Sequence, residues 1–313
     1  MIETPVNDTL LPLDRTKRWV RLLVNPSSGA QSAVAQLPTI VGALEDAGMQ
    51  VVLSFTAPDR PPTDLATQAA KAHYDLVVVA GGDGTISAVA QGLLGTQTPL
   101  GILPVGTFNN IARSLGIPRA LDEALAVLFH GRPWRIDSAT INDTPFMEVA
   151  GVGLDAGMFP VAEEIKSGAW YQVGSAVQTL RDYRPRRVRI ELADGRRVVT
   201  SPLLAIVSKM PFFGMGFAIA PTARPDSGQL ELLVFEGMTK LQLIAYFAAI
   251  SNGREMQEPD ISISTYQSTR FEIRTVGDAP IPVQADGRVV DHTPAVFQVV
   301  SHTLTVFAPQ PSH

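Results

Sequence analysis

The chain contains no cysteine among its 313 residues. This absence excludes disulfide bonds, thiolate metal sites and cysteine nucleophiles. Histidine is scarce, and none of the histidines is spaced like a metal ligand with an acid or with another histidine. They are His73, His130, His292, His302 and His313. A histidine metal site is therefore not expected.

The sequence also lacks a long hydrophobic run and an excess of positive charge. No run approaches the roughly 18 apolar residues that span a bilayer, and residues 1–18 lack the apolar segment of a signal peptide. The formal net charge of −5 argues against nucleic acid as a partner. We therefore expect a cytoplasmic protein, although a local basic patch can still contact a membrane surface.

The length suggests two domains, at roughly 100–200 residues for each. Up to about Asp137, predicted strands and helices alternate, which indicates a parallel sheet covered by helices. The strands are expected at 18–24, 50–55, 76–80 and 99–103, and the helices at 31–48, 62–72, 86–94, 111–115 and 121–130.

After Asp137 the pattern changes to short strands separated by Gly and Pro turns, which is typical of an antiparallel sandwich or barrel. Helices are expected only at 156–183 and 239–252. The pair Asp194-Gly195 predicts a hairpin, since Asp-Gly favours the turns that match strand twist. Two of the later strands are expected at 295–300 and 304–307.

The run Gly81-Gly82-Asp83-Gly84-Thr85 lies between a predicted buried strand and a predicted helix. Glycines at such a junction let the backbone approach a ligand, and the free N–H groups of a helix start favour phosphate. Asp83 would repel a bare phosphate, so a divalent cation such as Mg²⁺ is expected with the ligand. The alternative is a tight turn in which Asp83 only caps the helix.

Two further loops of similar composition follow parallel strands, at Asn25-Pro26-Ser27-Ser28-Gly29 and at Gly106–Asn110. In open α/β sheets, ligands bind at the carboxyl ends of the strands. Three such loops at one sheet edge favour a nucleotide site over unrelated turns.

These loops carry a family resemblance. Asn25-Pro26-x-Ser28-Gly29, then Gly81–Thr85, then Gly106-Thr107-x-Asn109 with Ala112-Arg113 resemble the catalytic domain of the diacylglycerol kinase family, close to soluble bacterial lipid kinases of the YegS type. The similarity spans almost the whole chain. It continues through 115–118, Asp137, 151–156, Arg184-Pro185, 219–223, 228–230 and Asp286-Gly287.

The resemblance implies a fold of two domains. Residues 1–137 would form a parallel-sheet nucleotide-binding α/β domain related to phosphofructokinases, and residues 138–301 an antiparallel β-sandwich domain for the lipid. Residues 302–313 are a candidate for packing back on the first domain.

The resemblance also implies ATP- and Mg²⁺-dependent phosphorylation of a lipid hydroxyl, diacylglycerol-like or sphingoid. One of the nucleotide contacts that it implies is Thr56, for which the alternative is an ordinary hydroxyl at a strand end without a role in binding. The implied nucleotide contacts are Asn25, Ser28, Gly29, Thr56, Gly81, Gly82, Asp83, Gly84, Thr85, Ile86, Ser87, Gly106, Thr107 and Asn109.

The implied metal network consists of Asp83, Asn110 and Asp137. Asn110 stands where relatives often have Asp, and its amide oxygen can still act as a ligand. The family also has an accessory metal loop, matched here by residues 224–228, with Ser227 at a position that is commonly acidic. Asp226 is the candidate ligand there, and a plain Asp-Ser-Gly turn is the alternative.

The implied catalytic residues are Asp83, Asp286 and the residue after Gly287, where the family has its general base, a Glu. This chain has Arg288 there, and arginine cannot accept a proton. Either Asp286 or Asp291 takes that role, or the hydroxyl loses its proton late with little help. A missing general base typically slows a reaction by about 10²–10⁴-fold.

Three functions therefore remain open. The first is a lipid kinase at the membrane surface; the second is a weak or inactive nucleotide- and lipid-binding pseudokinase, motivated by Arg288. NAD kinase, which has a similar Gly-Gly-Asp-Gly-Thr turn, is the third, and the matches around Asn25 and Asn109 favour the lipid branch over it. For the pair Asp286-Gly287, the alternative to a catalytic role is a hairpin turn with a purely structural role.

Two segments are candidates for contact with lipid. The loop 209–217 is rich in Met and Phe and either lines an acyl-chain channel or packs in the core. A basic cluster either meets anionic headgroups or forms a solvated surface; it consists of Arg181, Arg184, Arg186, Arg187 and Arg189. The expected partners are ATP, a lipid alcohol and a membrane surface to which the protein binds peripherally, with a homodimer left open.

Overall fold

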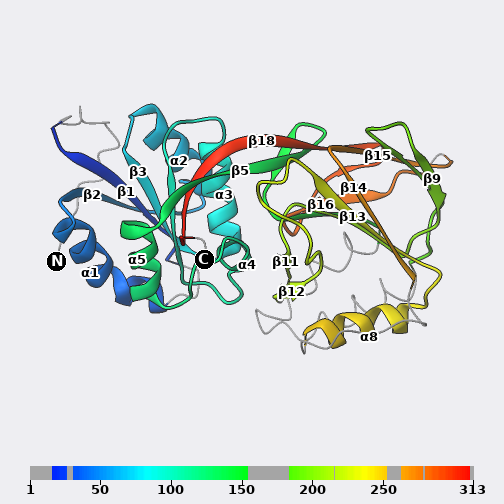
Figure 1. The fold of residues 1–313 in the computed structure, drawn as a ribbon, viewed down its shortest axis with the longest axis horizontal. Helices are drawn as coiled ribbons and strands as arrows, with labels where there is room; N and C mark the ends of the chain where they lie inside the picture. The colour runs from blue at the N-terminus through cyan, green and yellow to red at the C-terminus, as the bar shows by residue number, and fades with distance from the viewer. Residues whose placement is uncertain are drawn as a thin grey trace.

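The computed structural model of the chain describes residues 16–26, 31–153, 183–214, 216–251, 262–277 and 279–310. A parallel-sheet α/β domain lies at one end of the molecule and an antiparallel β-sandwich lies at the other (Figure 1). This arrangement confirms the fold class predicted from the sequence.

The first domain contains a parallel sheet with the strand order β2-β1-β3-β4. All six residues of β3 are buried, as is typical of a parallel strand that is covered on both faces. Its strands are β1 (Arg18–Val24), β2 (Met49–Phe55), β3 (Leu76–Gly81) and β4 (Leu100–Pro104). Its helices are α1 (Gln31–Asp46), α2 (Pro62–Lys71), α3 (Asp83–Leu93), α4 (Asn110–Ser114) and α5 (Leu121–His130).

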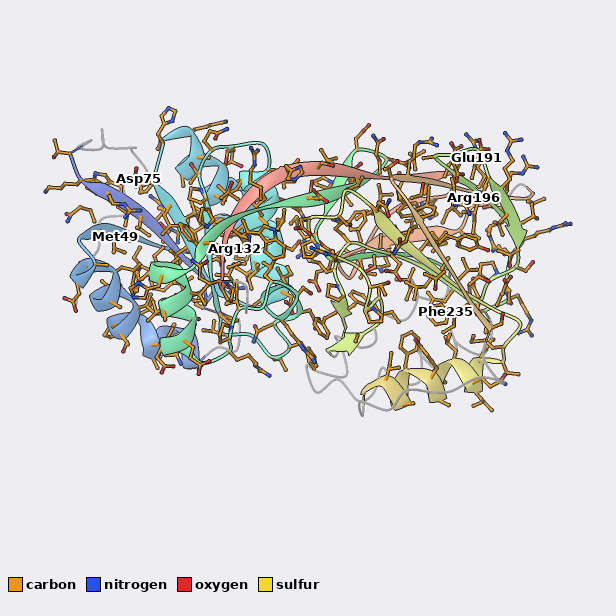
Figure 2. The ribbon with its side chains drawn as sticks, viewed as in Figure 1. Met49, Asp75, Arg132, Glu191, Arg196 and Phe235 are labelled. Atoms are coloured by element: carbon orange, nitrogen blue, oxygen red, sulfur yellow. The ribbon has the colours of Figure 1, made fainter. Side chains whose placement is uncertain are left out.

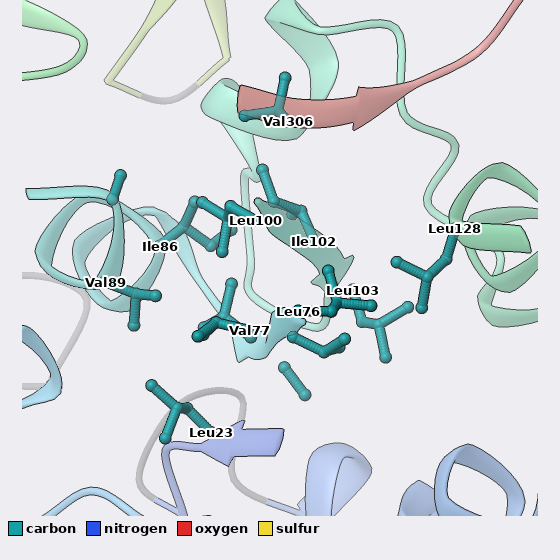
Figure 3. Packing of buried hydrophobic residues seen from close by; sticks show 14 of the residues in the cluster. Leu23, Leu76, Val77, Ile86, Val89, Leu100, Ile102, Leu103, Leu128 and Val306 are labelled. Carbon is teal, nitrogen blue, oxygen red and sulfur yellow. The ribbon is translucent and has the colours of Figure 1, made fainter. Parts of the chain in front are cut away.

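The core of this domain lies between the sheet and its helices. Figure 3 shows Leu23 of β1, Val77 of β3 and Ile86 of α3 in one cluster with Leu100 of β4. Val306, from near the end of the chain, lies in the same cluster. The C-terminal strand therefore completes the hydrophobic core of the N-terminal domain.

Two long strands connect the domains, β5 (Arg132–Ile141) and β18 (Ala295–Ala308) (Figure 1). They pair antiparallel along most of their length, with a register shift between Val300 and Leu304. The segments expected as two strands are thus one strand, and β5 was not predicted. β18 also pairs in parallel with β4, through Val306 and Leu100. One sheet therefore continues from the first domain into the second.

The second domain packs two antiparallel sheets face to face. The continuing sheet adds β15, β8 and β9 beside β18 and β6 beside β5, and the other sheet has the order β14-β13-β10-β7-β16-β17. Phe271 and Phe297 of the first sheet pack with Val207, Leu232 and Val283 of the second. The remaining strands are β6 (Thr144–Phe146), β7 (Val149–Gly153), β8 (Val188–Leu192), β9 (Arg197–Thr200), β10 (Leu204–Ser208), β13 (Leu230–Glu236), β14 (Ser262–Ser268), β15 (Arg270–Thr275), β16 (Pro282–Ala285) and β17 (Arg288–His292).

The predicted Asp194-Gly195 hairpin is present between β8 and β9. The two strands pair antiparallel, and Gly195 has a φ of +83°. Glu191 and Arg196, which flank this turn, lie at the outer end of the sandwich (Figure 2). The turn is therefore remote from the α/β domain.

The outer face of the six-stranded sheet is covered by α8 (Lys240–Ser251) and a short hairpin of β11 (Phe212–Phe213) and β12 (Phe217–Ala218). Phe235 of the sheet lies beside α8 (Figure 2), with its ring centroid 5.6 Å from that of Tyr246 and 6.1 Å from that of Phe247. Within the described ranges, no helix combines the length and the apolar composition that crossing a bilayer requires. The helix expected at 156–183 falls almost wholly outside those ranges.

Close packing of α2 against α3 leads to a stability prediction. A Cβ on Gly92 of α3 would lie 2.4 Å from the carbonyl oxygen of Thr63 in α2. Since that oxygen belongs to the backbone, Gly92→Ala must separate the helices, and we expect a loss of about 1–3 kcal/mol in the free energy of unfolding. Urea denaturation followed by circular dichroism measures this loss.

Gly42→Ala is the matched control, because Gly42 is also helical and a Cβ there meets no atom within 4 Å. We expect this variant to gain about 0.5–1 kcal/mol from helix propensity. Equal stabilities of the two variants would contradict the packing described for α2 and α3.

Candidate active site

The loops that follow the parallel strands meet at one edge of the sheet. Asn25, after β1, donates from Nδ2 to Oγ1 of Thr85 at 2.9 Å. The N–H of Val105, after β4, donates to the carbonyl of Gly81 at 3.1 Å. Thr56, after β2, is buried, and its N–H donates to the last carbonyl of β1 at 2.9 Å. The structure therefore joins four strand ends in one hydrogen-bonded surface.

Gly82 and Gly106 bring two of these loops into direct backbone contact. A Cβ on Gly106 would lie 2.4 Å from the Cα of Gly82. Asn109 closes the second loop, because its Oδ1 accepts from the N–H of Gly106 at 2.9 Å and its Nδ2 donates to the carbonyl of Gly106 at 2.8 Å. Only glycine fits this contact, so the resulting surface consists of bare backbone.

A cavity of about 660 Å³ lies against this surface. Its size is within the range of small-molecule sites, roughly 300–1,000 Å³. Helix α3 begins in its wall, and the positive end of a helix dipole favours an anion. The lining residues are Ala57, Pro58, Pro61, Pro62, Thr63, Gly82, Asp83, Gly84, Thr85, Ala88, Gly106, Thr107, Phe108 and Arg288.

Asp83 is the first residue of α3 and lines this cavity. Its Oδ1 accepts a hydrogen bond from the N–H of Ile111 in α4 at 3.0 Å. Asp83 therefore fixes the start of α4 and presents a negative charge beside the cavity. A phosphate would need a cation next to this carboxylate.

Asn110 lies deep beside Asp83 and is 2% exposed. Its Nδ2 donates to the carbonyl of Gly214 at 2.9 Å, and its side chain is also hydrogen-bonded to Glu148. Its Oδ1 is buried without a hydrogen-bond partner in the described part of the chain. A buried acceptor of this kind suits a cation or a donor group of a ligand.

The oxygen atoms of Asp83 and Asn110 suit Mg²⁺, which prefers oxygen ligands. Within the described ranges, no group of three or more acids or histidines is placed to hold a metal ion. Mg²⁺ usually binds through one or two carboxylates, water and substrate phosphates. The residues present therefore fit a metal ion that arrives with a nucleotide.

Asp286 connects helix α3 to the second domain. Its carboxylate accepts hydrogen bonds from Oγ of Ser87 at 2.6 Å and from the N–H groups of Met147, Glu148 and Val149 at 2.9, 2.9 and 3.3 Å. Burial raises the pKa of Asp286, although these hydrogen bonds act in the opposite direction. Asp286 is therefore both a candidate catalytic carboxyl group and a link between the domains.

Glu148 is a candidate residue that the sequence interpretation missed. It is 5% exposed, and its pKa is raised well above the usual range by burial and by the negative charges of Asp83 and Asp286. The available signal was a charged residue directly before the apolar strand β7. Its closeness to Asp83 and Asp286 depends on the tertiary fold, which the local pattern does not reveal.

Arg288 follows the turn of Asp286 and Gly287, which have φ angles of +43° and +83°. Its side chain lines the cavity together with Asp83. Asp291, the other candidate base, is not among the lining residues. It accepts a hydrogen bond from Asn142 at 2.7 Å near the far end of β17. The charges of Asp83 and Asp286, in contrast, both act on Glu148.

Asp137 takes part in a buried ion pair instead of a network with Asp83. Its Oδ2 lies 2.8 Å from Nζ of Lys209, and both side chains are fully buried. The N–H groups of Gly228 and His302 donate to its two oxygens at 2.8 and 2.9 Å. Burial alone would raise the pKa of Asp137, but these partners hold it below the usual value.

The loop 224–229 surrounds the same ammonium group. Nζ of Lys209 donates to the carbonyls of Arg224 and Gln229 at 2.9 and 3.1 Å and to Oγ of Ser227 at 3.3 Å. Asp226 instead accepts a hydrogen bond from Nε1 of Trp134 at 3.1 Å. The cation that these two carbonyls bind is therefore a lysine of the chain itself.

Several residues implied by the resemblance lie outside the described ranges. These are Ser28 and Gly29 in the first loop and residues 154–156. Arg181 of the basic cluster also lies outside these ranges. Arg184, Arg186, Arg187 and Arg189 are exposed. Among the other nucleotide candidates, Thr107 lines the cavity, whereas Ile86 and Ser87 are buried in α3.

The loop 209–217 packs on α4. Lys209, Met210 and Phe213 are buried, and the guanidinium of Arg113 lies 3.9 Å from the ring centroid of Phe212. Arg113 also donates to the carbonyl of Gly216 at 2.9 Å. The described part of this loop therefore serves as packing between the two domains.

The sequence of the chain is similar to those of known protein families and proteins. Residues 19–141 match the family described as the diacylglycerol kinase catalytic domain, and residues 148–308 match the YegS C-terminal NAD kinase β-sandwich-like domain. The chain is 32% identical over 250 residues to "Probable lipid kinase YegS-like" of Chromohalobacter salexigens, which covers 76% of this chain and 77% of that protein.

Two further similarities agree with these matches. A diacylglycerol kinase of Bacillus subtilis is 30% identical over 249 residues, covering 77% of this chain and 81% of the relative. The solved structure of a diacylglycerol kinase from Bacillus anthracis shares the fold, with a TM-score of 0.73 at 22% identity over 93% of this chain and 97% of the other.

The buried ion pair gives a prediction for Lys209→Met. This change leaves the carboxylate of Asp137 buried without its cation, and breaking such a pair costs about 3–5 kcal/mol. We expect a loss of this size in the free energy of unfolding, measured by urea denaturation.

Arg197→Met is the control, because Arg197 forms an exposed ion pair with Glu191 at 2.9 Å, and such pairs contribute about 1 kcal/mol or less. The double variant Lys209→Met/Asp137→Leu removes both charges and should recover part of the loss. If Lys209→Met unfolds at the same urea concentration as the wild type, the account of this ion pair is wrong.

Proposed function

Because the chain belongs to the diacylglycerol kinase catalytic-domain family, we propose that it transfers the terminal phosphate of ATP to the hydroxyl group of a lipid. The cavity between the strand-end loops and the second domain carries this proposal. It combines a bare backbone surface, the start of a helix and a fixed carboxylate, which are the features that phosphoryl transfer requires.

The nucleotide phosphates would bind along the residues from Gly82 to Thr85, with the loop at Gly106 and Thr107 opposite. The backbone contact between Gly82 and Gly106 supports this placement, since it leaves no side chain between the loops. Asn25 and Thr85 would fix the phosphate loop through their hydrogen bond. The proposed contacts of Ser28 and Gly29 rest on the resemblance alone.

Asp83 and Asn110 would hold Mg²⁺ together with phosphate oxygens. When bound, the metal ion would neutralise the charge that develops on the transferred group. The unpartnered Oδ1 of Asn110 supports this assignment. Asp137 has no part in it, because Lys209 engages its carboxylate.

The hydroxyl proton would pass to a carboxyl group at the domain junction. Arg288 stays protonated and cannot accept it. Asp286 and Glu148 are the candidates, and burial raises the pKa of both, which brings a carboxylate closer to the basicity that the task needs. The position of Arg288 equally supports the alternative of a weak or inactive pseudokinase.

The lipid would reach the site from a membrane surface to which the protein binds peripherally. Leu241 and Ile244 on α8 are 78% and 42% exposed, and exposed apolar side chains favour contact with lipid.

A transfer assay tests the function. The purified protein is incubated with terminally labelled ATP, Mg²⁺ and diacylglycerol or a sphingoid base in detergent micelles, with NAD in a separate reaction. We expect label in a lipid product and none in NAD. Label in NAD would contradict the proposal, and nucleotide binding without transfer to any lipid would favour the pseudokinase.

Asp83→Asn tests the proposed site within the same assay. Loss of this carboxylate should lower turnover on the order of 10²-fold or more, the usual effect of removing one electrostatic contact to a transition state. Asp122→Asn is the control, because Asp122 is an exposed acid in the first turn of α5. Equal turnover of the two variants would remove Asp83 from the proposed mechanism.

A further inference from the structure

Arg288 is a cation in the wall of the nucleotide-sized cavity. Among the described residues that line it, only Arg288 and Asp83 carry charge, and Arg288 alone comes from the second domain. The resemblance implies a glutamate at this position. The chain therefore reverses the charge at one side of its proposed active site.

The fold holds Arg288 in place through its neighbour Asp286. The carboxylate of Asp286 is bonded to Ser87 of α3 at 2.6 Å and to the N–H of Met147 at 2.9 Å. The tight turn at Asp286 and Gly287 follows, and Arg288 begins β17 directly after it. This anchored turn keeps Arg288 beside the start of α3.

The guanidinium of Arg288 has no structural task in the described part of the chain. It is exposed, and it forms no ion pair with any described acid. Other arginines near the junction are engaged, since Arg113 bonds to Gly216 and Arg119 bonds to Thr107. With respect to the residues that the structure describes, this guanidinium is therefore available for a ligand.

A phosphate group is the ligand that this surrounding favours. Guanidinium presents a planar set of N–H donors that pairs with two phosphate oxygens at once. The start of α3 lines the same cavity, and the positive end of its dipole also favours an anion. Asp83 would repel phosphate, and a fixed positive charge on the opposite domain offsets that repulsion together with the proposed metal ion.

We propose that Arg288 binds the phosphate group that is transferred, as the terminal phosphate of ATP before the reaction and as the lipid phosphate after it. This inference rests on the proposed function. It gives a role to the arginine that stands at position 288 in place of the implied glutamate. The second domain thereby contributes a phosphate-binding cation instead of the base. Arginine residues that stabilise the charge of a transferred phosphate are a recurring element of phosphoryl transfer.

Nucleotide binding tests this role without any need for turnover. Isothermal titration with Mg²⁺ compares ADP with a non-hydrolysable ATP analogue that has nitrogen between its β- and γ-phosphates. We expect Arg288→Ala to lower the affinity for the analogue by roughly 10- to 100-fold and the affinity for ADP by less than about 3-fold. Such a difference corresponds to the loss of a charge-assisted hydrogen bond to the terminal phosphate alone. Arg288→Lys should bind the analogue with intermediate affinity.

Arg196→Ala is the matched control, since Arg196 is an exposed arginine of the same domain that does not line the cavity. Its affinities should equal those of the wild type. The proposal would be overturned if Arg288→Ala bound the analogue with unchanged affinity, or if its affinities for the analogue and for ADP fell by the same factor. A second titration uses a short-chain lipid phosphate. If Arg288→Ala binds this ligand more weakly but binds the ATP analogue with unchanged affinity, the proposal is also overturned.

The outcomes separate this inference from the proposed function. A wild type that binds the analogue through Arg288 but labels no lipid would refute lipid kinase activity and leave the phosphate contact standing. Lipid labelling with normal analogue binding by Arg288→Ala would refute the contact alone. Arg288→Glu should bind the analogue more weakly than Arg288→Ala, and a gain in its turnover at unchanged affinity would show that position 288 acts as a base site instead.

Discussion

The carboxylate of Asp286 is the contact on which the proposed site depends. It accepts hydrogen bonds from Ser87 of α3 and from three successive N–H groups at residues 147–149. These bonds hold the β-sandwich in contact with α3, the helix that follows the proposed phosphate loop. They also place Glu148 near Asp83 and put Arg288 in the cavity wall. The proposed active site is therefore a property of the domain junction, and neither domain contains it alone.

A second buried carboxylate, Asp137, fixes the strands that connect the domains. It lies in β5, bonds to the N–H of His302 in β18, and pairs with the ammonium of Lys209. Lys209 in turn donates to the carbonyls of Arg224 and Gln229. Lys209 is therefore the cation that balances the charge of Asp137 in this part of the fold. The family resemblance implied metal ligands at Asp137 and Asp226 because it compares positions, whereas the local role depends on the residue at 209.

Local patterns were sufficient to predict the strands β1 to β4 and the helices α1 to α5 of the first domain. Apolar runs, helical periodicity and glycine turns are set by residues close in sequence, and β1 and α5 occur at the predicted positions. The pairing of β5 with β18 was not predictable in this way, because it joins segments more than 150 residues apart. The buried positions of Glu148 and Lys209 were missed for the same reason. Each depends on partners that tertiary folding brings near.

The account's central claim is that nucleotide phosphates bind between the loop at Gly82 and a cation of the second domain. A crystal structure with Mg²⁺ and the non-hydrolysable ATP analogue tests this claim most directly. We expect the phosphates to contact the N–H groups of residues 82–85, the metal ion to bind near Asp83, and the guanidinium of Arg288 to lie within hydrogen-bond distance of the terminal phosphate. Phosphates bound elsewhere, or bound at this loop with Arg288 directed away from them, would contradict the claim.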